Sequence, residues 1–346
     1  MWAMIVKEFR ELRRDRPTMA MLIALPIIML IVFGYAANFS VHSIRTNVYG
    51  PSAEAVAKEL RSPFTVEHVD PSGNRADAEQ ALVDNRVDLA IVTASSPPAH
   101  ALVNGSQLFA AQAAVGALSR LGNTVTVEVL FNPDLKTSWV MVPALIGLTM
   151  AFIGTIVTSL GLVRERTAGT LEQLAVMPFR PSDVIVGKIA PYFAIAAADL
   201  VVVTILGALL FGVPFNGSPF LFALGAALFL FVVLGLGVLI STVSKSEGQA
   251  IQTAIFVLLP QFLLSGVLFP LSSMPVAIRV IGYALPLTWF LEIAQGILLR
   301  GESISGLWLS FVVLTVMAVV IFTAAVLRFR RDLAPGSRRG HRGAGA

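Results

Sequence analysis

The sequence contains no cysteine, which excludes disulfide bonds, thiolate metal sites and cysteine nucleophiles. His42, His68, His100 and His341 are scattered and lack the paired spacing of a zinc site. There is no G-x-x-x-x-G-K-[ST] phosphate loop, and no G-x-S-x-G nucleophile elbow. We therefore expect no catalytic residue, no metal site and no cofactor within this chain, and no ATP hydrolysis by the chain alone.

Charged residues are also scarce. They make up 13% of the chain, whereas hydrophobic residues make up 56%. A soluble domain normally carries about 25% charged residues. So many apolar residues cannot all be buried in one globular core, and the composition indicates a protein embedded in membrane lipid. No nucleic-acid-binding module is visible, and the basic C-terminus suits a topology signal or a contact with anionic lipid.

The apolar runs predict a mainly α membrane protein. A crossing helix needs about 20 mostly apolar residues. Six segments qualify as transmembrane helices: 18–39, 139–163, 189–211, 220–243, 251–271 and 307–327. Residues 1–37 also resemble a signal peptide, but their apolar run exceeds the typical length of about 7–15 residues, so we expect an uncleaved first span.

Lysine and arginine predict the orientation, because cytoplasmic loops are enriched in them. They precede the first span, lie between spans two and three, and follow the last span, whereas residues 212–219 contain none. Both termini are therefore expected in the cytoplasm, with the protein in the cell membrane. Residues 1–17 have the pattern of an interfacial amphipathic helix, and residues 334–346 are expected to form a disordered basic tail.

Residues 40–137 are the largest water-soluble region and are predicted to form a small extracytoplasmic α/β domain between helices 1 and 2. Strands are expected near 44–49, 64–69, 87–92 and 124–131, and helices near 52–60, 76–84 and 106–121. Strands alternating with helices are typical of this fold class. Its acidic residues have the spacing of caps and turns, so no metal site is expected there.

Residues 272–306 are interrupted by prolines, which break the chain into short helices. The apolar run 286–299 is short for a crossing, and a seventh span would place the C-terminal arginines outside. We expect a re-entrant helical hairpin before the last span. The alternative is a plain external loop.

The segment 164–180, after the second span, combines a charged helix end, a glycine and a short amphipathic helix. Leu171 and Leu174 would share one face, and Pro178 would end the helix. A helix of this size suits docking into a groove of another protein, and a solvated loop is an equally good explanation.

The string V-R-E-R-x-x-G-T-L-E-Q-L-x-x-x-P at 163–178 resembles the signature of ABC-2-type permeases, and Lys188 fits the same pattern. The string L-L-S-G-V-L-F-P-L-S-S-M-P at 263–275 is similar to the re-entrant region of that family. The resemblance covers nearly the whole chain. It implies a dimer of permeases driven by two cytoplasmic ABC ATPase subunits, which would bind ATP and Mg. It also implies a drug- or lipid-exporting branch with a large external domain.

The resemblance identifies 164–180 as the coupling helix. The residues expected to contact the ATPase are Arg164, Glu165, Arg166, Gly169, Thr170, Leu171, Glu172, Leu174 and Pro178. Polar residues at membrane depth are costly and usually face a cavity or a partner. The candidates for the pathway or an interface are therefore Asp199, Gln252, Gln261, Glu292 and Gln295.

The sequence thus predicts the permease subunit of an ATP-driven exporter of a hydrophobic or amphipathic compound. The second permease copy would be identical or related. The alternative is a membrane-anchored sensor or assembly factor that uses the external domain to bind a ligand. An anchor needs one span, so the number of predicted spans favours the transporter.

Overall fold

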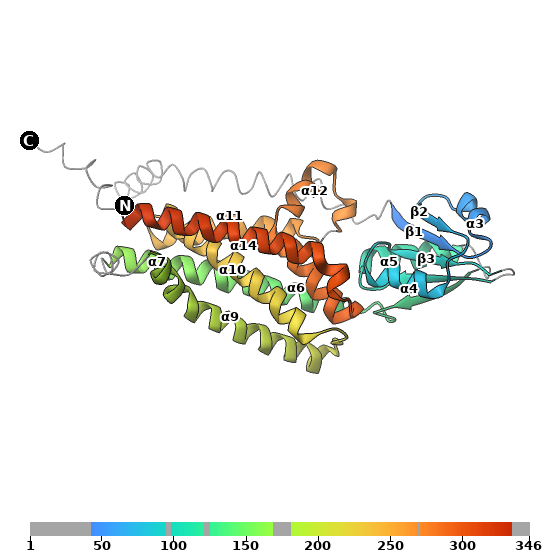
Figure 1. Cartoon of the computed structure of the whole chain (residues 1–346), viewed down its shortest axis with the longest axis horizontal. Coiled ribbons are helices and arrows are strands. Elements are labelled where there is room, and N and C mark those ends of the chain that lie inside the picture. Colours follow the sequence, from blue (N-terminus) through green and yellow to red (C-terminus); the bar gives the residue numbers. More distant parts are fainter. Residues whose placement is uncertain (1–42, 95–97, 121–124, 169–180, 269, 334–346) are drawn as a thin grey trace, which may run out of the picture.

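The computed structural model describes residues 43–94, 98–120, 125–168, 181–268 and 270–333. The molecule is elongated, with a bundle of long helices and a small α/β domain at one end of it (Figure 1). The predicted interfacial helix 1–17, the first span 18–39 and the tail 334–346 lie outside the described residues. Those three elements stay predictions.

The α/β domain contains a five-stranded sheet with the order β2-β1-β3-β4-β5. Its strands are β1 (Ile44–Tyr49), β2 (Phe64–Asp70), β3 (Leu89–Val92), β4 (Ala99–Asn104) and β5 (Val125–Leu130). All neighbours run parallel except β3 and β4, which are antiparallel. The helices α3 (Ala53–Glu59) and α5 (Leu108–Leu118) pack on one face, and α4 (Arg75–Val83) packs on the other. The predicted small α/β domain is confirmed.

One strand was not predicted. β4 follows the Ser-Ser-Pro-Pro segment and pairs with β3 as a hairpin, so two strands succeed each other without a helix between them. It begins Ala-His-Ala, which carries little of the β-branched and aromatic content that marks a strand. Ala101 and Val103 pack in one core of the domain and Leu102 in the other. The strand is thus formed by burial on both faces.

The bundle confirms a multi-pass membrane protein. Four described helices are long and apolar enough to cross a membrane: Thr137–Thr167, Ala190–Phe211, Pro219–Val243 and Ile304–Arg328. The first is built from α6 (Thr137–Phe152), the π-helical turn η2 (Ile153–Val157) and α7 (Thr158–Thr167); the others belong to α9 (Pro181–Phe211), α10 (Pro219–Val243) and α14 (Ile304–Leu333). They correspond to the predicted spans 139–163, 189–211, 220–243 and 307–327.

The region of the fifth predicted span, 251–271, is only partly one helix. α11 (Glu247–Leu264) is followed by its C-cap residue Ser265; Gly266 then takes a φ of +96°, and η3 (Leu271–Ser273) follows. α11 is not among the four described helices that meet the length and composition of a span. A full crossing by 251–271 therefore stays a prediction.

The proline-rich region forms a bent pair of helices. α12 (Val276–Tyr283) starts after Pro275, and α13 (Pro286–Gln295), which continues into η4 (Gly296–Arg300), starts with Pro286. Proline suits the first helical position because its fixed φ fits and its missing N–H has no partner there. The two helices meet at 77°, as in a broken span or a re-entrant loop. Counted as one span, the pair would be the fifth in the described residues.

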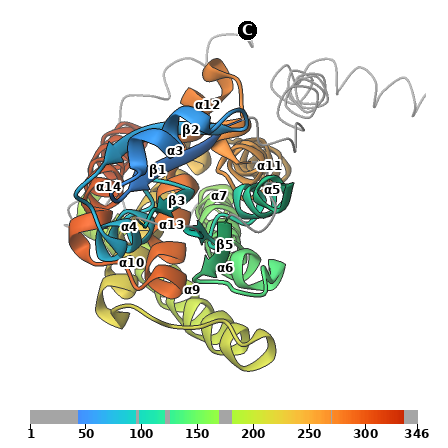
Figure 2. The same ribbon diagram turned by 90° about the vertical axis from the view of Figure 1, so that its right-hand side faces the viewer.

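α10 lies at the centre of the packing. Its Phe229 stacks on Phe290 of α13, with 4.7 Å between the ring centroids, and both side chains are fully buried. A Cβ on Gly237 of α10 would lie 2.9 Å from the carbonyl oxygens of Gly154 and Thr155 in η2. Small residues of this kind allow membrane helices to approach closely. By contrast, α9 lies at the edge of the bundle (Figure 2), and only 17% of its apolar window is buried.

Candidate functional site

The end of α7 leads into the predicted coupling segment. Arg164 forms an ion pair with Glu247 at the start of α11, with 2.9 Å between Nε and Oε2. Arg166 donates to the carbonyl oxygens of Ser241, at 2.7 Å, and of Ser244 at the end of α10. These contacts fasten α7 to the connection between α10 and α11. Glu165 is partly buried beside them.

The other predicted coupling residues lie outside the described residues. They are Gly169, Thr170, Leu171, Glu172, Leu174 and Pro178. The structure therefore places the two arginines in contacts within this chain, whereas the docking helix itself stays a prediction.

The polar residues of the long helices do not form one cluster. The carboxylate oxygen Oδ2 of Asp199, on α9, is buried and has no hydrogen-bond partner among the described residues. On α11, the side-chain oxygens of Gln252 and Gln261 are also buried and have no hydrogen-bond partner among the described residues. As whole residues, Gln261 is buried and Gln252 is partly buried. A polar atom without a partner at membrane depth is costly, which keeps these positions as candidates for a pathway or an interface.

Glu292 and Gln295 of α13 contact different elements. The Nε2 of Gln295 lies 3.5 Å from the carbonyl oxygen of Val140 in α6. Glu292 instead accepts from Asn85 of the α/β domain at 3.0 Å and from Arg300 at 2.7 Å. Arg300 was not among the predicted site residues. Its position in the segment predicted to form a re-entrant hairpin gave no signal that its side chain is fully buried.

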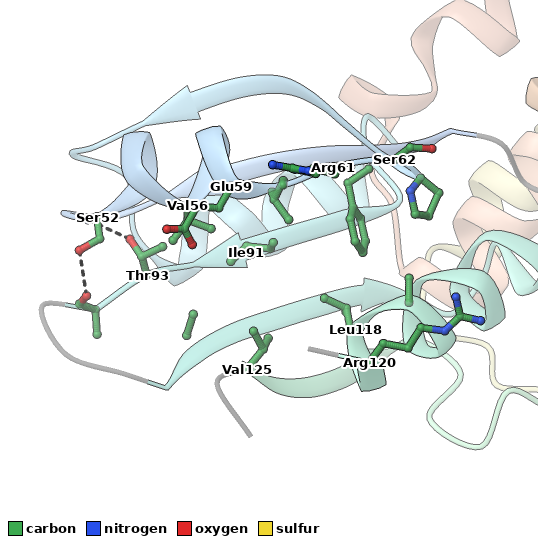
Figure 3. A pocket seen from close by; sticks show the side chains of 16 residues that line it. Ser52, Val56, Glu59, Arg61, Ser62, Ile91, Thr93, Leu118, Arg120 and Val125 are labelled. Atoms are coloured by element: carbon green, nitrogen blue, oxygen red, sulfur yellow. Dashed lines mark hydrogen bonds between the residues drawn. The ribbon is translucent and has the colours of Figure 1, made fainter. Parts of the chain in front are cut away.

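The α/β domain contains a cavity of about 550 Å³ between α3 and α5 (Figure 3). Ile91 and Leu118 contribute to its mainly apolar lining, and Arg61 and Arg120 are exposed at its edge. A volume of roughly 300–1,000 Å³ is typical of pockets for small molecules. Two residues of the cavity lining are hydrogen-bonded to each other: the backbone N–H of Ser52 donates to Thr93 Oγ1 at 3.1 Å.

Comparison with known proteins assigns the family. Residues 16–327 match the model of the ABC-2 family transporter protein. The chain belongs to the ABC-2 transporter family. The matched region of this ABC-2 protein includes the α/β domain as well as all the candidate spans, so both parts belong to the family architecture.

Its relatives include permeases from Escherichia coli strain K12. The chain is 29% identical over 363 residues to the probable multidrug ABC transporter permease YbhR, covering 96% of this chain and 99% of YbhR. It is 27% identical over 364 residues to the probable multidrug ABC transporter permease YbhS, covering 96% and 97% of the two chains. The inner membrane transport permease YhhJ is 36% identical over 205 residues, or 59% of this chain and 54% of YhhJ. This ABC-2 protein is thus similar to the permeases YbhR and YbhS over 96% of its length.

Proposed function

We propose that this ABC-2 protein is the permease subunit of an ATP-driven exporter that moves a hydrophobic or amphipathic compound across the cytoplasmic membrane. A separate cytoplasmic ATPase would bind ATP and Mg, and a second permease copy would complete the pathway. The observation that carries the proposal is the apolar helix Thr137–Thr167, 31 residues long, which leads directly into the predicted coupling segment. The names of the relatives YbhR and YbhS support a drug-like cargo.

The contacts of Arg164 and Arg166 support a mechanical role for the end of α7. They join α7 to the start of α11 and the end of α10, so a push on segment 164–180 would act on three helices. Burial of one leucine contributes about 1.5–3 kcal/mol, whereas an exposed ion pair contributes about 0–1 kcal/mol. Leu171 and Leu174 should therefore dominate the affinity for the ATPase, and Glu165 and Glu172 should set the register.

The test replaces Leu171 and Leu174 by aspartate. The double variant should insert normally, lose ATPase co-purification in mild detergent and lose export. A matched control places two aspartates at Lys245 and Ser246, in the loop between α10 and α11, where an aspartate can still cap α11. Export at the wild-type rate by L171D/L174D would show that the segment is only a connecting loop. Isolation of the wild-type chain without any ATP-binding protein would count against the transporter itself.

A second function is favoured by the cavity in the α/β domain. The domain would bind an amphipathic ligand there, and the chain would act as a membrane-anchored sensor or assembly factor. Replacing residues 138–333 by a single unrelated transmembrane helix separates the two functions. A sensor would keep its ligand response after this replacement, whereas an exporter would lose all transport.

A further inference from the structure

Arg300 joins the α/β domain to the helical bundle. It ends η4, and its side chain has no exposed surface. Within the bundle, its Nη2 lies 2.7 Å from Glu302 Oε2 and 2.7 Å from Glu292 Oε1. Toward the α/β domain, its Nε donates to the carbonyl oxygen of Val83 at 3.0 Å, and its Nη1 donates to Ser106 Oγ at 3.2 Å. One guanidinium therefore connects two carboxylates of one part to two acceptors of the other.

Asn85 supplies a second contact across the same junction. Its Nδ2 donates to Glu292 at 3.0 Å, while its Oδ1 accepts from Asn104 at 3.1 Å within the α/β domain. The pocket around Glu302 is tight, because a Cβ on Gly306 would lie 2.3 Å from Glu302 Oε1 and one on Gly296 would lie 2.6 Å from Oε2. The absence of side chains at these two glycines therefore leaves the space that the carboxylate occupies beside Arg300.

We propose that the buried contacts of Arg300 hold the α/β domain against the end of the α12–α13 pair and make the two parts move together. The physical reason is the cost of a buried charge that loses its partners, which is far higher than the cost of a lost surface ion pair. Partial separation would leave the guanidinium short of acceptors while it is still buried, since its side chain has no exposed surface in the closed junction. The junction should therefore be either closed or open, with few states between. This inference concerns the domain arrangement and goes beyond the proposed export function.

The charged groups around Arg300 predict how closure of the junction depends on pH. The groups that face it from the α/β domain and the bundle are Arg45, Asp84, Arg86, Asp88, Glu292, Arg300 and Glu302. Burial raises the pKa of Glu302 to about 7, although the nearby Arg300 opposes this shift. In the open state Glu302 would be hydrated, with a pKa near its ordinary value. The closed state therefore binds the proton more tightly, and acidification from pH 8 to pH 6 should favour closure.

The test uses single cysteines, since the chain has none of its own. In S106C, the thiol replaces a junction side chain that is 1% exposed, so a maleimide should react only when the junction opens. In A111C, the thiol lies in the core of the α/β domain and reports unfolding of that domain instead. Rates are divided by that of the exposed K58C. All measurements use the full chain in lipid nanodiscs.

The perturbing variant is N85D. It keeps the acceptor toward Asn104 but places a carboxylate against Glu292. The loss of a hydrogen bond to a charged group and the added repulsion should speed labelling of S106C about tenfold or more. The matched control is N74D, which preserves the N-cap of α4, at the opposite end of that helix from Asn85. Combining N85D with E292Q restores a donor and acceptor pair and should return the slow rate.

Three results would overturn the proposal. The first is an equal rate for S106C with and without N85D. The second is a parallel rise in A111C labelling, which would mean that the domain unfolds rather than undocks. The third is a labelling rate of S106C that stays fast when E292Q is added to N85D. For the proton dependence, normalised labelling of S106C should fall about tenfold from pH 8 to pH 6 and become flat in E302Q. Labelling that rises on acidification would contradict the assigned direction.

Discussion

Replacing Gly237 by alanine tests how α10 packs against η2. The new Cβ would lie 2.9 Å from the carbonyl oxygens of Gly154 and Thr155, and 2.9 Å from the Cβ of Thr158. Two of these three neighbours are backbone atoms, which cannot rotate away as the end of a flexible side chain can. α10 must therefore move off the helix Thr137–Thr167. Because lipid is as apolar as the helix surface, close van der Waals packing is what holds such helices together.

The magnitude follows from overpacking. Added methylene groups in a packed core cost about 1–3 kcal/mol, and the backbone contacts place G237A toward the upper part of that range. The matched control is G248A on α11, where an added Cβ meets nothing within 4 Å. Alanine favours a helix over glycine, so the control should be neutral or slightly stabilising. Thermal unfolding of the purified chain, followed by tryptophan fluorescence in one detergent, compares the two variants.

An unfolding temperature of G237A equal to those of the wild type and G248A would refute this reasoning. It would mean that the contact relaxes at no cost. If G237A is destabilised as expected, export should fall as well, because α10 would lose its close contact with the helix Thr137–Thr167, which leads into the predicted coupling segment.

Three further predictions concern the bundle and the topology. F290A should destabilise the chain by about 3–5 kcal/mol through loss of the stacked pair, whereas V312A, at an exposed site on α14, should change the unfolding temperature little. D199N should raise the unfolding temperature, because an amide loses less solvation than a carboxylate when buried. It should also lower export. Normal export by D199N would mean that Asp199 contributes only to packing. A membrane-impermeant maleimide should label K58C in intact cells and K245C only after lysis, and the opposite pattern would reverse the proposed orientation.

The sequence predicted most of the α/β domain because each of its elements has a strong local pattern. The predicted strand 44–49 matches β1, and the predicted helix 76–84 differs from α4 by one residue at each end. β4 was missed because its local content is weak and its stability comes from burial on both faces. Local patterns carry no information about neighbours that are distant along the chain.

The junction between the α/β domain and the bundle also depends on contacts between distant parts of the chain, which local patterns do not predict. Glu292 was selected because an acid at membrane depth needs a partner, whereas Arg300, in the segment predicted to be a re-entrant hairpin, was not selected. Their contacts with Asn85 and Val83 join positions more than 200 residues apart. Periodicity and composition describe one element at a time, so they could identify the costly acid without identifying the arginine that stabilises it.

The hairpin of β3 and β4 also decides where the chain leaves the α/β domain. β1 and β3 run in one direction, whereas β4 and β5 run in the other, so the start of β1 and the end of β5 lie at the same end of the strands. With five parallel strands, the chain would have left at the opposite end of the strands and needed a return segment. The single reversal makes the domain an insertion whose two ends lie on the same side of it. Domains of this kind can be exchanged or shortened between two helices without rerouting the rest of the fold.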